Sequence, residues 1–225
     1  MKPMFLFFRV LFLVSLHGAL FADANKVNPS QVGAKIFSKV CAQCHGLEAE
    51  GNSSLNTPAL ASQSSIYISE QLHKFKNGLR GADSKKDATG KLMAQQAKLL
   101  SSKDIQELSI YLSALKSPVL KVDTSASALR GKELYQKKAN CISCHGLYGE
   151  GNESMKAPKL NILSPAYIEI ELNKFSRGQR VGAKTKDVTG HLMVKVLNDY
   201  GLQSKDFKDL ANYISGLKNP DSKSK

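Results

Sequence analysis

The chain has 225 residues, of which 42% are hydrophobic and 23% are charged, and its formal net charge is +13. This balance is typical of a globular protein and argues against a disordered or a membrane-embedded chain. The lysines are scattered among acidic residues, so we expect no nucleic-acid binding; an acidic protein or an anionic membrane surface is a better match for the positive charge.

The N-terminus has the layout of a secretory signal peptide. Lys2 precedes an apolar stretch from Met4 to Leu16, and small residues follow at Ala22-Asp23-Ala24. We predict a signal peptide over 1–22 with cleavage near 22–24. The alternative is a retained transmembrane anchor, but Arg9 cuts the apolar run below the roughly 20 residues that a span needs.

The first predicted helix opens at Pro29-Ser30 and carries Val32, Ile36 and Val40 at helical spacing. It leads into the pentapeptide Cys41-Ala42-Gln43-Cys44-His45. Cys-x-x-Cys-His is the attachment signature of a c-type haem, in which the two thiols bond the haem and the histidine ligates its iron.

A loop rich in Gly, Asn and Pro follows this motif. The next predicted helix has Ile68, Leu72 and Phe75 on one face and ends at Gly78, which suits a C-cap. A polar loop then leads to Met93. The last helix of this unit is expected to start at Ser101 or Ser102, with an apolar stripe formed by Ile105, Leu108, Leu112 and Leu115.

The second half of the chain repeats the first. Its motif is Cys141-Ile142-Ser143-Cys144-His145, and the special residues recur at a constant offset: Pro158, Tyr167, Leu172, Lys174, Phe175, Gly178, Arg180, Asp187 and Met193. The helix before this motif is expected near Ser127, with Leu129, Leu134 and Tyr135. The last helix carries Phe207, Leu210, Ile214 and Leu217, after an insertion of two residues around 198–201.

The repeat predicts an all-α fold of two tandem domains. We expect the first domain over 25–118, the second over 119–220, with a linker at 117–125, and a flexible tail over 221–225. No convincing strand pattern occurs in the sequence.

Each haem iron needs a second axial ligand besides His45 or His145. Met93 and Met193 follow their histidines by the same number of residues, and the remaining methionine after the signal peptide, Met155, follows its motif too closely. The sequence therefore predicts His/Met ligation. Core packing of the two methionines is the alternative.

Other ligands and other uses of the cysteines fit less well. His73 is expected on a solvated helix face beside Lys74, and His191 could in principle replace Met193. A zinc site built from all four cysteines, plain disulfides or a thioredoxin-like site would leave the histidines and methionines unexplained.

Two further pairs are candidates for supporting roles. Pro58 and Pro158 could offer the carbonyl that accepts a hydrogen bond from the ligating histidine, or could serve as simple turn residues. Arg80 and Arg180 could pair with haem propionates, with a surface location as the alternative.

The sequence resembles the dihaem class I cytochromes c, specifically the cytochrome c4 family, over essentially the whole mature chain. The residues that carry the likeness are the two motifs, Pro58-Ala59-Leu60-Ala61-Ser62-Gln63, Tyr67, Gln71-Leu72, Phe75-Lys76-Asn77-Gly78-Leu79-Arg80, the Met93 segment, and Ile105, Leu108 and Tyr111-Leu112. The second repeat departs from this pattern at Leu163, which replaces Gln63, and at the insertion.

The resemblance implies two cytochrome c folds related by a pseudo-twofold axis, with two covalently bound haem c groups near the interface. It also implies a periplasmic electron carrier, not an enzyme, with no catalytic residues. A quinol-oxidising complex is the implied donor and a haem-copper terminal oxidase the implied acceptor, with possible peripheral membrane association. A dihaem enzyme, such as a peroxidase or thiosulfate dehydrogenase, and a cytochrome subunit of a larger respiratory complex are the alternatives.

Overall fold

The structure is a computed structural model that describes residues 31–83, 85–183 and 185–218. The expected signal peptide, the predicted start of the first helix at Pro29-Ser30 and the tail over 221–225 lie outside these residues. Within them the regular elements are helical, and the only strand-like pairing is two isolated bridges, Asn52 with Thr57 and Asn152 with Ala157. The predicted all-α class is confirmed.

The two domains contain the same elements in the same order. The first has α1 (Gln31–Ile36), the π-helical turn η1 (Phe37–Cys41), α2 (Ala42–His45), α3 (Ser65–Lys76), α4 (Ala88–Lys98) and α5 (Ser102–Ala114). The second has α6 (Ala126–Glu133), η2 (Leu134–Lys138), α7 (Ile142–His145), α8 (Pro165–Ser176), α9 (Val188–Asp199) and α10 (Ser204–Ser215). The duplication in the sequence is therefore a duplication of fold.

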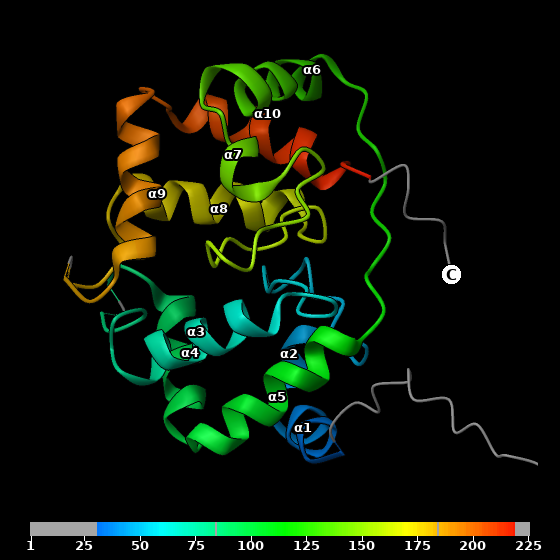
Figure 1. Cartoon of the computed structure of the whole chain (residues 1–225), viewed down its shortest axis with the longest axis vertical. Helices are drawn as coiled ribbons and strands as arrows, with labels where there is room; N and C mark the ends of the chain where they lie inside the picture. Colours follow the sequence, from blue (N-terminus) through cyan, green and yellow to red (C-terminus); the bar gives the residue numbers. More distant parts are fainter. Residues whose placement is uncertain (1–30, 84, 184, 219–225) are drawn as a thin grey trace, which may run out of the picture.

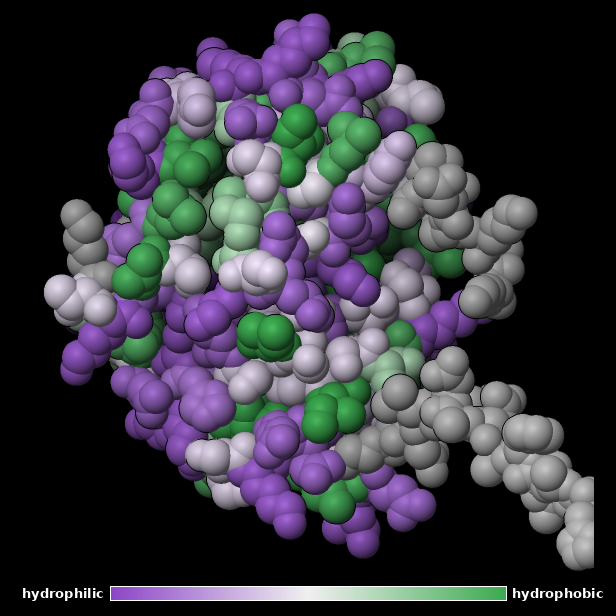
Figure 2. Space-filling view, in the orientation of Figure 1, coloured by the Kyte–Doolittle hydropathy of each residue, from purple (hydrophilic) through white to green (hydrophobic). Residues whose placement is uncertain are grey.

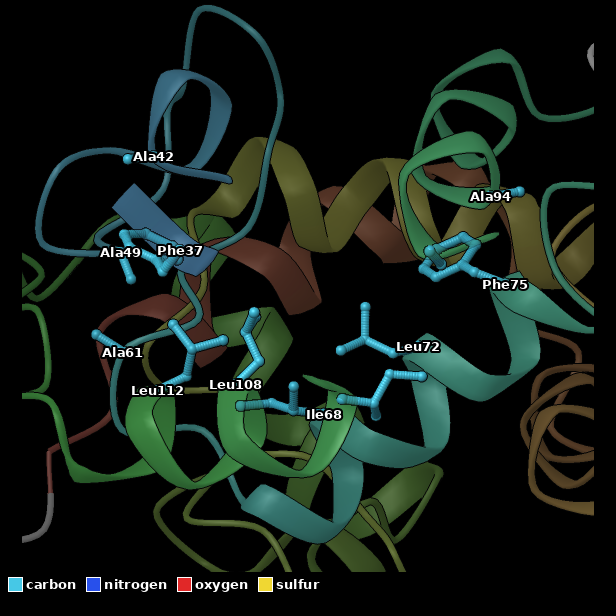
Figure 3. Close-up of a cluster of buried hydrophobic side chains, with 12 residues drawn as sticks. Phe37, Ala42, Ala49, Ala61, Ile68, Leu72, Phe75, Ala94, Leu108 and Leu112 are labelled. Atoms are coloured by element: carbon cyan, nitrogen blue, oxygen red, sulfur yellow. The ribbon is translucent and has the colours of Figure 1, made fainter. Parts of the chain in front are cut away.

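The domains lie one against the other, and the chain between α5 and α6 runs extended along one side of both (Figure 1). Each domain has its own hydrophobic core. In the first, helices α3 and α5 and the turn η1 contribute the large side chains, and Figure 3 shows Ile68, Leu72, Leu108 and Leu112 converging on one space.

The N-terminal helix of each domain crosses the C-terminal helix at a glycine. A Cβ on Gly33 would lie 2.3 Å from the carbonyl oxygen of Glu107, and one on Gly131 would lie 2.0 Å from that of Asp209. A Cβ atom cannot approach a carbonyl oxygen this closely. The main chain of α1 therefore packs directly against that of α5, and the main chain of α6 directly against that of α10.

The predicted apolar face of this helix is correct for Leu134 and Tyr135, which are buried, but wrong for its first residues, since Val32 is 49% exposed and Leu129 is 65% exposed. In the first domain the buried aromatic residue is Phe37. Because Gly33 and Gly131 occupy the contact with the C-terminal helix, the buried face passes through the glycine and the aromatic residue four positions later.

The helix ends predicted at Ser101 and at Gly78 agree with the structure. Ser101 forms a capping box with Asp104 at α5. Ser64 and Ser164, which the sequence analysis did not single out, cap α3 and α8 by accepting hydrogen bonds from the main chain of the first turn. Gly78 and Gly178 follow the C-caps of α3 and α8 with φ of +69° and +64°, a conformation that favours glycine.

The surface is mainly hydrophilic, with small separate hydrophobic groups on the face shown in Figure 2. Among the residues that the structure describes, no helix is both long enough and apolar enough to cross a membrane.

Candidate haem sites

Each haem-attachment motif forms a single helical turn that ends at its histidine. The next residue, Gly46 or Gly146, has a φ of +84° or +81°. A Cβ there would lie 2.3 Å from the carboxylate of Glu50 or Glu150. Glycine after the histidine is therefore favoured by the main-chain conformation, and a larger residue there would also displace the glutamate carboxylate.

The two histidines are held in the same way. The Nδ1–H of His45 donates to the carbonyl of Pro58 at 3.0 Å, and that of His145 donates to the carbonyl of Pro158 at 3.1 Å. The bridge between Asn52 and Thr57, repeated at Asn152, closes the loop just before each proline. The carbonyl role for the two prolines is thus confirmed.

Burial lowers the pKa of both histidines, although the hydrogen bonds to Pro58 and Pro158 act against this. A neutral imidazole that donates through Nδ1 carries its lone pair on Nε2. The Nε2 atom of His45 is buried and has no hydrogen-bond partner among the described residues. A buried nitrogen lone pair left in this way fits an iron ligand.

None of the four cysteines is in a disulfide. Burial raises the pKa of Cys41 to about 11 and that of Cys141 to about 12. No cluster of three or more His, Cys, Asp or Glu side chains that could hold a metal ion occurs in the described part of the chain. The four-cysteine zinc site considered from the sequence is therefore not formed, because each Cys-x-x-Cys pair belongs to a different domain.

The methionines lie on helices and not in polar loops, so that part of the prediction is wrong. Met93 is in the middle of α4 and Met193 in the middle of α9. Asp87 and Asp187 start these helices by accepting a hydrogen bond from the main-chain N–H of Gly90 and Gly190. Glycine suits the third residue of each helix, because a Cβ at Gly90 would lie 2.1 Å from the Asp87 carboxylate that caps α4.

The second domain contains a cavity beside its motif. Cys141, Cys144, His145 and Met193 all line it, and Met93 is half-buried against the core of the first domain. The remaining lining is largely apolar and includes Ile168, Leu172, Phe175, Leu197, Leu210 and Ile214. An apolar cavity with two thiols, an imidazole and a thioether fits a covalently bound haem.

The alternative histidine ligands are bound to main-chain carbonyls. His73 donates from Nδ1 to Ser69 within α3, and His191 donates from Nε2 to Gly182 at 2.9 Å. Neither His73 nor His191 is among the residues that line the cavity of the second domain, whereas Met193 is.

Arg80 and Arg180 lie at the contact between the domains and are buried, so the surface alternative is wrong. Both pair with one carboxylate, Glu171, at 2.7 and 2.5 Å, and they stack on Phe75 and Phe175. Burial by itself would raise the pKa of Glu171, but the positive charges of Arg180, Arg80 and the nearby Lys174 outweigh it and hold the pKa at about 2.

Two reciprocal ion pairs flank this cluster. Lys74 of α3 pairs with Asp187 at 2.7 Å, and Lys174 of α8 pairs with Asp87 at 2.8 Å. Each pair thus links one domain to the aspartate that caps the methionine-bearing helix, α4 or α9, of the other domain. Sequence reasoning noted these four residues only as repeat matches and expected the helix face beside Lys74 to be solvated; their pairing across the interface is visible only in the structure.

The comparisons with known proteins agree with this geometry. The model of the Cytochrome c family matches residues 30–116 and 128–218. A cytochrome c4 of Stutzerimonas stutzeri is 31% identical over 187 residues, which cover 79% of this chain and 84% of that protein. The chain belongs to the cytochrome c4 family. It accordingly has two covalently bound haem c groups with iron and is a dihaem electron-transfer protein.

Cytochrome c4 structures have the same fold. The crystal structure of reduced recombinant cytochrome c4 from Pseudomonas stutzeri matches with a TM-score of 0.70 and 30% identity, covering 84% of this chain and 98% of that one. Among other relatives, a thiosulfate dehydrogenase electron acceptor of Thiomonas intermedia is 32% identical over 182 residues, covering 77% of this chain and 78% of that protein.

Proposed function

We propose that the iron of the first domain is ligated by His45 and Met93 and that of the second by His145 and Met193. The thiols of Cys41, Cys44, Cys141 and Cys144 attach the two groups. The observation that carries this assignment is the cavity that His145 and Met193 line together with the two cysteines of the second motif. The unpartnered Nε2 of His45 supports the same arrangement in the first domain.

The bound haem supplies a one-electron couple between ferric and ferrous iron. The contribution of the protein is to orient the imidazole through the proline carbonyl and to surround the site with apolar side chains that exclude water. We assign no catalytic residue, because two protein ligands on each iron leave no position for a substrate.

We further propose that the carrier works in the periplasm and that its two domains extend over 25–118 and 119–220. A quinol-oxidising complex would be the donor and a haem-copper oxidase the acceptor. A similarity to an oxidase subunit supports this acceptor: a cbb3-type cytochrome c oxidase subunit CcoP of Helicobacter pylori is 31% identical over 184 residues, although the chain covers only 58% of it.

A second donor is suggested by the relatives named as thiosulfate dehydrogenase electron acceptors. The two alternatives are separated by mixing the oxidised holoprotein with a thiosulfate dehydrogenase plus thiosulfate, or with a quinol-oxidising complex plus quinol. The faster reduction, followed at the haem absorption bands by stopped flow, identifies the donor.

The ligand assignment is tested by replacing each methionine in turn. Met93→Ala or Met193→Ala should remove about half of the near-infrared sulfur-to-iron charge-transfer band of the ferric protein, because each variant loses one thioether ligand. Met155→Leu is the matched control and should leave the band unchanged. A full band in either alanine variant would contradict the assignment for that domain.

A further inference from the structure

A side chain of the first domain holds the main chain of the second. Gln63 is 3% exposed and lies just before α3. Its Oε1 accepts from the N–H of Lys159 at 2.9 Å, and its Nε2 donates to the carbonyl of Lys159 at 2.9 Å. Oε1 also accepts from the N–H of Ser64, the N-cap of α3. The amide is thereby fixed on both sides of the domain boundary.

The peptide group that Gln63 binds is also the one that holds His145. The N–H of Lys159 and the carbonyl of Pro158 belong to a single peptide unit, and this carbonyl accepts from Nδ1 of His145 at 3.1 Å. The amide of Gln63, the N–H of Lys159, the carbonyl of Pro158 and the imidazole of His145 therefore form one chain of hydrogen bonds.

Hydrogen bonds in series polarise one another. When the N–H of Lys159 donates to Gln63, electron density in the peptide unit shifts toward the oxygen of Pro158. That oxygen becomes a stronger acceptor for the Nδ1–H of His145, and the opposite nitrogen, Nε2, becomes a stronger electron donor. A more basic ligand stabilises ferric over ferrous iron.

The reciprocal contact cannot form in the first domain. In the sequence repeat, Leu163 is the residue equivalent to Gln63, and Ala59 is the residue equivalent to Lys159. Leu163 packs in the core of the second domain, and its side chain has no atom that could accept a hydrogen bond from the N–H of Ala59 as Gln63 accepts from Lys159. Among the described residues, the chain of hydrogen bonds therefore reaches His145 and has no equivalent at His45.

We propose that Gln63 is a positioning residue for the haem site of the other domain. Through the Pro158–Lys159 peptide it sets the orientation and basicity of His145. The reduction potential of the second haem is therefore lower than it would be if Gln63 did not make this contact. This proposal rests on the ligation by His145 proposed above. It makes Gln63 one source of a difference between two otherwise duplicated sites.

The test is a spectroscopic redox titration of the full-length holoprotein carrying Gln63→Leu, the residue that the chain itself has at 163. We expect the midpoint of the second haem to rise, by up to a tenfold change in its oxidised-to-reduced ratio, which is about 59 mV for a one-electron couple. The midpoint of the first haem should not move. Met193→His, which replaces the thioether by a nitrogen ligand, identifies which midpoint belongs to the second site.

A second measurement separates this role from a purely structural one. The Nδ1–H proton of His145 in the reduced protein should move upfield in the NMR spectrum of Gln63→Leu, because its hydrogen bond to Pro158 becomes weaker. Ser62→Gly is the matched control: it removes the neighbouring bond from Lys159 Nζ to Ser62 at a residue with φ of +65°, and should change neither signal.

Gln63→Met, which keeps the length of the side chain without its hydrogen bonds, replaces Gln63→Leu if that variant incorporates haem poorly. The proposal is overturned if neither midpoint moves, or if both rise equally, while the wild type shows two low-spin His/Met haems. A wild type without those spectra would instead refute the proposed ligation.

Discussion

At the scale of single residues, Glu171 is a buried position at which the two domains differ in charge. The first domain has Gln71 at the equivalent site, and the carboxylate of Glu171 faces Arg80 and Arg180 together. Two buried guanidinium groups thus depend on one buried carboxylate. A charge buried without a partner is far more costly than one that is paired.

We predict that Glu171→Gln lowers the free energy of unfolding by about 3–5 kcal/mol at neutral pH, because it leaves two buried positive charges without their carboxylate. Denaturant unfolding of the holoprotein measures this loss. Asp199→Asn, which breaks the exposed pair with Lys195, should cost less than about 1 kcal/mol. Equal effects of the two substitutions would contradict the structure.

The same carboxylate predicts a pH dependence. The pKa of Glu171 is about 2 in the folded protein and about 4.3 in an unfolded chain, so its stabilising effect is present above pH ~4.3 and disappears as the pH falls toward 2. The difference in melting temperature between the wild type and Glu171→Gln should therefore shrink over this range. A difference that stays constant down to pH 2 would show that the ionised carboxylate is not its cause.

At the scale of elements, the crossings of α1 on α5 and of α6 on α10 set the geometry of each domain. Both crossings occur where a glycine of one helix meets a carbonyl of the other. The π-helical turn that follows each N-terminal helix runs to Cys41 in the first domain and ends at Lys138, shortly before Cys141, in the second. The crossing therefore also positions the cysteines and the histidine.

We predict that Gly33→Ala destabilises the protein by about 1–3 kcal/mol, although alanine favours the helix, because its Cβ would collide with the main chain of α5. Thermal unfolding followed by circular dichroism measures the change. Lys39→Ala on the exposed side of η1 is the control and should have little effect. A variant at Gly33 as stable as the control would mean that the helices are farther apart than the structure has them.

At the scale of the whole molecule, the contact between the domains is a buried network of charges with a pseudo-twofold pattern. The reciprocal pairs of Lys74 with Asp187 and of Lys174 with Asp87 lie on either side of Glu171. These groups are little exposed, so dissolved salt screens them weakly. Exposed lysines such as Lys85, Lys86 and Lys103, in contrast, lie on the outer surface of the described residues, and the formal net charge of the chain is +13.

This contrast predicts two different responses to salt. The rate of electron transfer to an acidic protein partner should fall tenfold or more between about 10 mM and about 500 mM salt, because long-range attraction is screened. Electron exchange between the two haems within the chain should stay nearly constant, since the domain contact is buried. Stopped-flow mixing measures the first rate and flash photolysis the second. Parallel decreases would indicate that salt opens the domain contact.

Much of this protein follows from its sequence alone. The Cys-x-x-Cys-His motifs, the constant offset of the repeat and the helix caps at Ser101 and Gly78 are local or periodic signals, so they predict the haem attachment, the duplication and the helix ends without a structure. The position of Met93 within a helix was missed because the segment before it is polar, and the cap by Asp87 that starts the helix is seen only in the structure.

Only the tertiary structure decides how the two copies are joined. Arg80, Lys74 and Gln63 are polar residues whose partners lie about one domain length away along the chain, and no periodicity in the sequence pairs them. Their burial follows from the docking of one domain on the other, which turns residues that a single domain would expose into an interface. The sequence by itself determines two haem domains, and the contact between them decides how those domains differ.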